Sequence, residues 1–393
     1  LYYPQQLLPG LAAVMSYRRH NGKDAKAPLT VLVWSHPATE RKTLERRMQA
    51  FKVLLGGFSW VTLFFPEQDE VKSHLSHNSR VMRKAKYLRS KFGQDAFIVV
   101  YYAHDISADF IAQSAMQAYP NASRVCFGDA LGVVYSNDYF TDQTFPVGVV
   151  EAFSRPIQTI RNLLYRIKRN WSLPNRRHRL DADHAVLILP CDPGGDFLTG
   201  KKLQCVDYKS LICVLNTLSG STQRCLSERD YWGEGGAGSS VVMLLGAYSE
   251  SRLTSESKEC ALYVEAALQH ILPGTKITLK AHPVSQPDKI ALIKKALSAH
   301  YETVVVISDE IPIEIMPSLV KQNKIISFSY SSVSLVYLYG SCVLHAMNDA
   351  LINIFFPEES RLWMLESNEL YLQQIVVARR LRSKHSEELV CQE

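Results

Sequence analysis

The fold is decided by the stretch Thr275-Lys276-Ile277-Thr278-Leu279-Lys280-Ala281-His282-Pro283, which predicts a short β-strand that ends in a His-Pro turn. The strand, at 275–280, follows a predicted helix at 255–271 and precedes another at 287–299. A further strand is expected at 303–307. Strands that alternate with helices of this length imply a parallel sheet with helices on both faces.

The same alternation continues along most of the chain. Before the quoted stretch, strands and helices are expected in turn at 29–35, 39–56, 58–65, 72–91, 96–103, 107–119 and 124–127, with further strands at 185–189 and 240–247. After it come a short helix from Pro312, a strand at 324–328, a helix from Ser334, a strand at 342–345 and a final helical stretch at 358–381. The 393 residues exceed one ordinary hydrophobic core, so we expect two domains.

This order of strands and helices is typical of the GT-B architecture, an α/β fold with two doubly wound, Rossmann-like domains that face a cleft. We therefore expect this fold. We expect the first domain at 1–180, ending in a basic linker helix, and the second at 181–393. The last helical stretch is long enough to cross back over the first domain.

Composition favours a cytoplasmic protein. Eight cysteines are scattered without a C-x-x-C pair, as expected for free thiols in a reducing compartment, and neither a disulfide framework nor a zinc site is predicted. The apolar stretch 53–65 is shorter than a membrane span, and 325–348 is too polar for one. The chain starts at Leu1 without a methionine or a signal pattern, so we expect its native start upstream.

Positive charge is concentrated in one segment, 152–180, which holds eight Arg and Lys residues and no acid. Its apolar residues follow a three-four spacing, which predicts an amphipathic helix with a basic face. Such a helix, with Arg166, Lys168 and Arg169 on it, fits an anionic membrane surface or a polyanionic acceptor. The alternative is a linker helix that packs on its own domain. We expect no nucleic-acid partner.

Asp129 follows the strand predicted at 124–127 and lies between Gly128 and Gly132. The glycines allow a sharp turn and leave room for a ligand at the sheet edge. A carboxylate there can act as a general base if partial burial raises its pKa. It can equally cap the helix that follows.

His282 leaves the end of its strand beside Lys280, and Pro283 fixes the turn after it. A histidine in this place can donate a hydrogen bond or a proton to a departing phosphate. A purely structural role stays open, because a similar dipeptide, His36-Pro37, follows the first strand.

Small hydroxyl residues follow the strand at 324–328. Ser331 and Ser332, with the backbone amides that open the next helix, can bind an anion or simply cap that helix. Glu314, on the same sheet edge, can hold a ribose or favour the dipole of its own helix.

Two other motifs carry no predicted chemistry. The G-x-G-x-x-G match at 233–238 precedes a strand instead of following one, so it predicts a loop. The D-x-D at 181–183 lies at the entry to a strand, where a capping role is expected. We therefore predict no metal site.

Three of these segments, in chain order, form a family pattern: Asp129 to Gly132, His282-Pro283, and Ser331-Ser332. The chain resembles bacterial sialyltransferases of GT-B fold, a group that includes lipooligosaccharide sialyltransferases and capsule polysialyltransferases. Ala130-Leu131 stand where the family has a second acid. The resemblance implies that Asp129 is the general base and that His282 assists the leaving CMP phosphate.

In this family pattern Ser331 and Ser332 would bind the phosphate, and Glu314 the ribose, with Lys280 and Pro283 completing the CMP site. The first domain would then face the acceptor and the second would bind the CMP-sugar.

The resemblance implies an inverting, metal-independent glycosyltransferase of lipopolysaccharide or capsule biosynthesis. It would move sialic acid, or a related nonulosonic acid, from a CMP-activated donor to a glycan or glycolipid hydroxyl. No cofactor is expected, since the CMP-sugar is a co-substrate. Peripheral attachment to the cytoplasmic face of the inner membrane is expected too. The alternatives are a CMP-Kdo-dependent transferase of the same fold and a non-catalytic GT-B-like module that binds an anionic glycan or a membrane.

Overall fold

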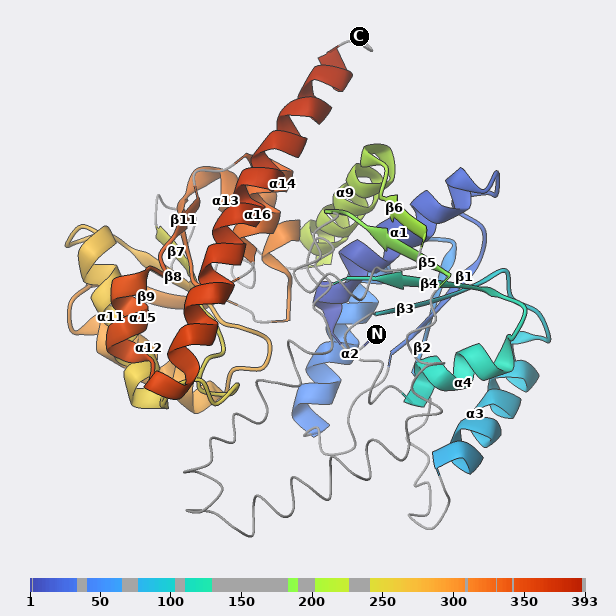
Figure 1. The fold of residues 1–393 in the computed structure, drawn as a ribbon, viewed down its shortest axis with the longest axis horizontal. Helices are drawn as coiled ribbons and strands as arrows, with labels where there is room; N and C mark the ends of the chain where they lie inside the picture. The colour runs from blue at the N-terminus through green and yellow to red at the C-terminus, as the bar shows by residue number, and fades with distance from the viewer. Residues whose placement is uncertain are drawn as a thin grey trace. The chain divides into compact units, whose positions relative to one another are not determined.

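Figure 1 shows the computed structural model of the protein, which describes residues 1, 3–33, 41–65, 77–102, 110–128, 183–189, 202–225, 241–307, 310–329, 331–340 and 343–390. The chain divides into two compact units. The first comprises Leu1–Tyr2, Gln6–Ala38 and Phe64–Leu211, and the second comprises Tyr3–Gln5, Thr39–Leu63 and Ile212–Glu393. The domain boundary predicted at 180 lies outside the described residues and stays a prediction.

The first unit holds a four-stranded parallel sheet in the order β3-β4-β5-β6. Its strands are β3 (Ile98–Tyr102), β4 (Ser123–Phe127), β5 (His184–Leu187) and β6 (Lys202–Cys205). The helices α3 (His77–Phe92) and α4 (Phe110–Ala118) pack against it, with a core that includes Leu88, Tyr101, Met116, Cys126 and Leu187. Strand β1 (Leu29–Leu32) also belongs to the first unit, whereas β2 (Val61–Phe64) belongs to the second unit up to Leu63.

Three elements are absent from the sequence-based expectation. The helix α1 (Leu7–His20), after the short 3-10 helix η1 (Pro4–Gln6), is buried from Leu7 to Arg18 and has no polar face to reveal its period. The other two are β6 and the helix α9 (Tyr208–Cys225), where only a loop was expected. Strand β6 is mostly exposed and polar, which hides it from an apolar pattern.

The second unit holds a five-stranded sheet in the order β11-β10-β7-β8-β9, and every neighbouring pair is parallel. The strands are β7 (Val241–Leu244), β8 (Ile277–Lys280), β9 (Val304–Ile307), β10 (Lys324–Ser327) and β11 (Val343–His345). All lie within the ranges predicted from apolar runs. The α/β fold with parallel sheets in two Rossmann-like units is confirmed.

The second unit holds most of α9, from Ile212 on. Its other helices are α2 (Arg41–Leu55), α11 (Glu256–His270), α12 (Pro287–Ser298), α13 (Pro317–Gln322), α14 (Ser331–Tyr339), α15 (Asp349–Phe355) and α16 (Glu358–Val390). The core under α11, α12 and α15 includes Tyr263, Leu279, Ile293, Phe328 and Ile352. Helix α16 runs along α14, as Figure 1 shows within this unit.

Two predicted helices differ in their bounds. The helix expected from Pro312 is split into a 3-10 turn, η4 (Ile313–Ile315), and α13, because Pro317 starts a new helix. Helix α14 begins at Ser331, three residues before the predicted Ser334. Among the described residues, Cys126, Cys205, Cys213 and Cys260 are free thiols. In the same residues we find no helix with the length and apolarity that a membrane crossing requires.

The register aligns the carboxyl ends of the five strands of the second unit. Leu244 pairs with both Lys280 and Ser327, Lys280 with Ile307, and Ser327 with His345. Residues that follow these positions therefore gather at one rim of the sheet, where open α/β folds bind their ligands.

Candidate functional site

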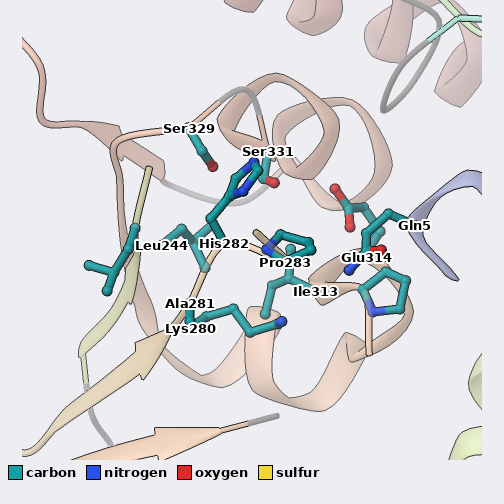
Figure 2. Close-up of a pocket in the computed structure, with 12 residues that line it drawn as sticks. Gln5, Leu244, Lys280, Ala281, His282, Pro283, Ile313, Glu314, Ser329 and Ser331 are labelled. Atoms are coloured by element: carbon teal, nitrogen blue, oxygen red, sulfur yellow. The ribbon is translucent and has the colours of Figure 1, made fainter. Parts of the chain in front are cut away.

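A pocket lies at this rim of the second unit (Figure 2). Its lining comes from the ends of β7, β8 and β10, the turn η4 and the N-terminal segment, namely Gln5, Leu244, Leu245, Lys280, Ala281, His282, Pro283, Pro312, Ile313, Glu314, Ser329 and Ser331. Five residues singled out from the sequence thus share one site: Lys280, His282, Pro283, Glu314 and Ser331.

The turn after β8 orients His282. The backbone N–H of Val284 donates to His282 Nδ1 at 3.4 Å, and that of Ser285 donates to the His282 carbonyl at 2.9 Å. A ring that accepts at Nδ1 carries its proton on Nε2, so the imidazole offers a donor at its far side. Figure 2 shows the ring beside Ser331 and Ser329, while the Lys280 side chain runs below Pro283.

Lys280 is the last residue of β8, and only 6% of it is exposed. A charge at such a buried position acts more strongly on its neighbours than a charge in water. Its position on the pocket wall adds positive potential beneath the His-Pro turn.

The two adjacent serines point in different directions. Ser331, the first residue of α14, lines the pocket together with Ser329. Ser332 is completely buried, and its hydroxyl donates to the Ser329 carbonyl at 3.0 Å. Its oxygen also lies 3.5 Å from His345 Nδ1. Ser332 is therefore not part of the pocket wall and holds the start of α14 in place.

Glu314 is held at the pocket by α14. The Ser334 hydroxyl donates to Glu314 Oε1 at 2.6 Å, and the Tyr339 hydroxyl donates to the Glu314 backbone carbonyl. Because η4 has only three residues, its dipole gives little reason for an acid there. The contacts instead fix a carboxylate on the wall opposite the His-Pro turn in Figure 2.

Two residues at or next to the pocket were not singled out from the sequence: Gln5 lines the pocket, and His345 lies beside Ser332. Gln5, in η1, lines the pocket although it is far from the other lining residues in the sequence. His345, at the end of β11, is hydrogen bonded through Nε2 to Asn368 Oδ1 at 2.8 Å. Burial lowers the pKa of His345 below its usual value, and the bond to Asn368 opposes this in part. His345 therefore favours the neutral form behind Ser332.

Several predicted residues lie outside the described part of the chain. These are Asp129, the basic segment with Arg166, Lys168 and Arg169, the loop at 233–238, and His36-Pro37. The strand that leads to Asp129, β4, ends at Phe127 as expected. Of the D-x-D motif, Asp183 is described, and its Oδ2 accepts from the Arg124 backbone N–H at 2.9 Å, in keeping with a capping role.

No group of three or more His, Cys, Asp or Glu side chains that could hold a metal ion occurs among the residues that the structure describes. The groups that converge on the pocket are an imidazole, an ammonium, a hydroxyl and a carboxylate. The first three can bind and stabilise a phosphate, and the carboxylate can accept from the hydroxyls of a sugar.

Residues 221–342 match the sequence profile of the family described as alpha-2,8-polysialyltransferase (POLYST). The match spans roughly a third of the chain. It contains every residue of the pocket wall except Gln5. The similarity is to sialyltransferases, a class of glycosyltransferases. No curated protein matches the chain significantly in sequence.

Similar solved structures are UDP-GlcNAc 2-epimerases. The enzyme from Neisseria meningitidis bound to UDP-GlcNAc has 12% identity and a TM-score of 0.49, over 99% of this chain and 97% of that one. A putative UDP-N-acetylglucosamine 2-epimerase from Listeria monocytogenes has 10% identity and a TM-score of 0.44, over 97% and 89% of the two chains. The S. aureus MnaA–UDP complex has 9% identity and a TM-score of 0.41, over 84% and 74%.

Proposed function

We propose that the protein transfers sialic acid from CMP-sialic acid to a hydroxyl of a glycan acceptor, with inversion and without a metal ion. The observation that carries the proposal is the pocket that joins Lys280, His282, Glu314 and Ser331 within the stretch that matches the polysialyltransferase profile. Each of these groups has a task in binding or releasing CMP.

Release of CMP leaves negative charge on its phosphate, and three groups can meet it. His282 presents a donor at Nε2, the start of α14 presents the Ser331 hydroxyl and backbone N–H groups, and Lys280 adds a positive charge. Donors that are held in place before the reaction stabilise charge as it develops, without reorganisation. Transfer then needs no metal to neutralise the phosphate.

Glu314 is assigned to the ribose of the donor. A carboxylate accepts more than one hydrogen bond, so the Ser334 hydroxyl can hold Oε1 while the group also accepts from ribose hydroxyls. Pro283 and Ile313 supply apolar parts of the same pocket wall.

The acceptor side of the reaction rests on predictions from the sequence. The acceptor hydroxyl must lose its proton as it attacks, and Asp129 is proposed as the general base. One direct displacement by that hydroxyl gives inversion at the sugar carbon. Arg166, Lys168 and Arg169 are proposed to hold an anionic acceptor or an anionic lipid surface, which would place the protein peripherally at the cytoplasmic face of the inner membrane.

Calorimetry with CMP, followed by transfer assays with CMP-sialic acid and CMP-Kdo, tests the proposal. Wild-type protein should bind CMP, and Ser331→Ala should weaken that binding, while the exposed Ser298→Ala serves as the matched control. Transfer should require CMP-sialic acid and continue in EDTA. If the protein transfers only from CMP-Kdo, the donor is CMP-Kdo and not CMP-sialic acid. If folded protein binds no CMP, the alternative of a non-catalytic GT-B-like module is favoured.

A further inference from the structure

A cluster of three charged side chains, two of them buried, lies on α11, α12 and the loop after β7 in the second unit. Lys289, on α12, is 2% exposed, and Glu259, on α11, is fully buried. Lys289 Nζ lies 3.0 Å from Glu259 Oε1 and 2.5 Å from Oε2 of Glu250, which belongs to the loop after β7. We call Glu250, Glu259 and Lys289 the rim cluster.

Both carboxylates of the rim cluster accept further hydrogen bonds from neighbouring residues. Glu259 also accepts from the Tyr263 hydroxyl at 2.7 Å and from the backbone N–H groups of Tyr248 and Ser249 at 3.2 and 2.7 Å. Such bonds are needed because charges lose much hydration energy on burial. An apolar core of the same volume often stabilises a fold as well as a buried ion pair does. Stability alone is therefore a weak reason for this arrangement.

The contacts of the rim cluster lead to three segments of the pocket wall. Glu259 holds the loop after β7 through Tyr248 and Ser249, next to Leu245. Glu250 Oε1 accepts from the Gln286 backbone N–H at 3.3 Å, in the turn that carries His282.

The third connection runs through Tyr248. Its hydroxyl donates to the Phe328 carbonyl, directly before Ser329 at the end of β10. Tyr263 adds a bond from the first loop, because its hydroxyl accepts from the Gly246 N–H at 2.9 Å. One network of hydrogen bonds thus ties together the ends of β7, β8 and β10, which are neighbours in the sheet.

We propose that Glu250, Glu259 and Lys289 are positioning residues that fix the His282 turn relative to the Ser329–Ser331 segment. They touch no substrate and act through the loops that they hold. The effect on turnover rests on the proposed function, whereas the effect on loop order does not. Donors to a phosphate lose their effect when they are displaced, and a misplacement of about 1 Å can cost on the order of a hundredfold in rate.

Glu250 gives the cleanest test, because it lies at the edge of the rim cluster and its loss leaves Lys289 paired with Glu259. Glu250→Ala removes the acceptor for Gln286, and Glu250→Gln keeps an oxygen there. Lys289→Met is the stronger change. Tyr301→Phe is the matched control, because it removes a buried hydrogen bond to the Ile271 carbonyl away from the pocket.

Each variant is measured for melting temperature, hydrogen–deuterium exchange of 281–286, CMP affinity and kcat/KM. Glu250→Ala should raise exchange in 281–286 and lower CMP affinity and kcat/KM by about tenfold or more, with Glu250→Gln restoring part of each. Tyr301→Phe should lower the melting temperature without these changes.

The proposal is overturned if folded Glu250→Ala exchanges at 281–286 as the wild type does. It is also overturned if Tyr301→Phe loses as much CMP affinity as Glu250→Ala. If Lys289→Met does not fold, the Glu250 variants decide. If the wild-type protein binds no CMP, the proposed function fails, and exchange at 281–286 still tests the positioning role.

Discussion

Replacement of His282 by alanine should slow transfer without unfolding the protein. The imidazole is held by the Val284 N–H at Nδ1, so its donor is in place before the phosphate departs. Loss of one such donor costs about 2.7–4 kcal/mol, which corresponds to roughly a hundredfold to a thousandfold in kcat. Because Lys280 and Ser331 line the same pocket and remain, we expect about a hundredfold.

The assay is steady-state release of CMP from CMP-sialic acid in the presence of acceptor. The KM for the donor should change less than kcat, because the hydrogen bond strengthens as charge develops on the phosphate. His300→Ala is the control, since His300 is exposed and its side chain is not part of the pocket wall. A His282→Ala variant with the kcat of the wild type would refute the role assigned to the imidazole.

The remaining predictions concern the base, the metal, the basic segment and pH. Asp129→Asn should keep CMP affinity and lose transfer by roughly a hundredfold or more, and wild-type transfer would exclude Asp129 as the base. Saturating EDTA should leave the rate unchanged; a strict need for magnesium or manganese contradicts this. Replacing Arg166, Lys168 and Arg169 by Glu should abolish co-sedimentation with anionic vesicles at low salt. If the variant and the wild type sediment equally, the segment 152–180 is only a linker. Burial lowers the pKa of His345, so the unfolded state binds its proton first and stability should fall as pH drops below about 6.5. In urea titrations the free energy of unfolding of His345→Gln should fall less at low pH than that of the wild type. An unchanged pH dependence in this variant would exclude the contribution of His345.

The strands of the second unit could be predicted because each is a short apolar run that ends at a polar or turn-forming residue. Helix α1 could not, since burial on all sides removes the apolar-polar period. Helix α9 was missed although a signal exists. Asp207 caps it by accepting from the Ser210 N–H at 2.7 Å, and Leu211, Val214 and Leu218 form its buried side.

The site could be predicted where it depends on strand ends, because a parallel sheet brings these ends to one rim. The roles of Ser331 and Ser332 could not be separated, since successive residues of a helix point about 100° apart and the start of α14 fixes which one faces the pocket. Gln5 gives no local sign at all, because only the packing of the N-terminal segment brings it to the pocket.

Transfer itself tests the central claim most directly. The protein is incubated with CMP-sialic acid, an oligosialic acid acceptor and EDTA, and the acceptor is examined by mass spectrometry. The account predicts an acceptor lengthened by sialic acid residues, with one CMP released for each residue added. An unmodified acceptor and intact CMP-sialic acid, in the presence of folded protein, would contradict it.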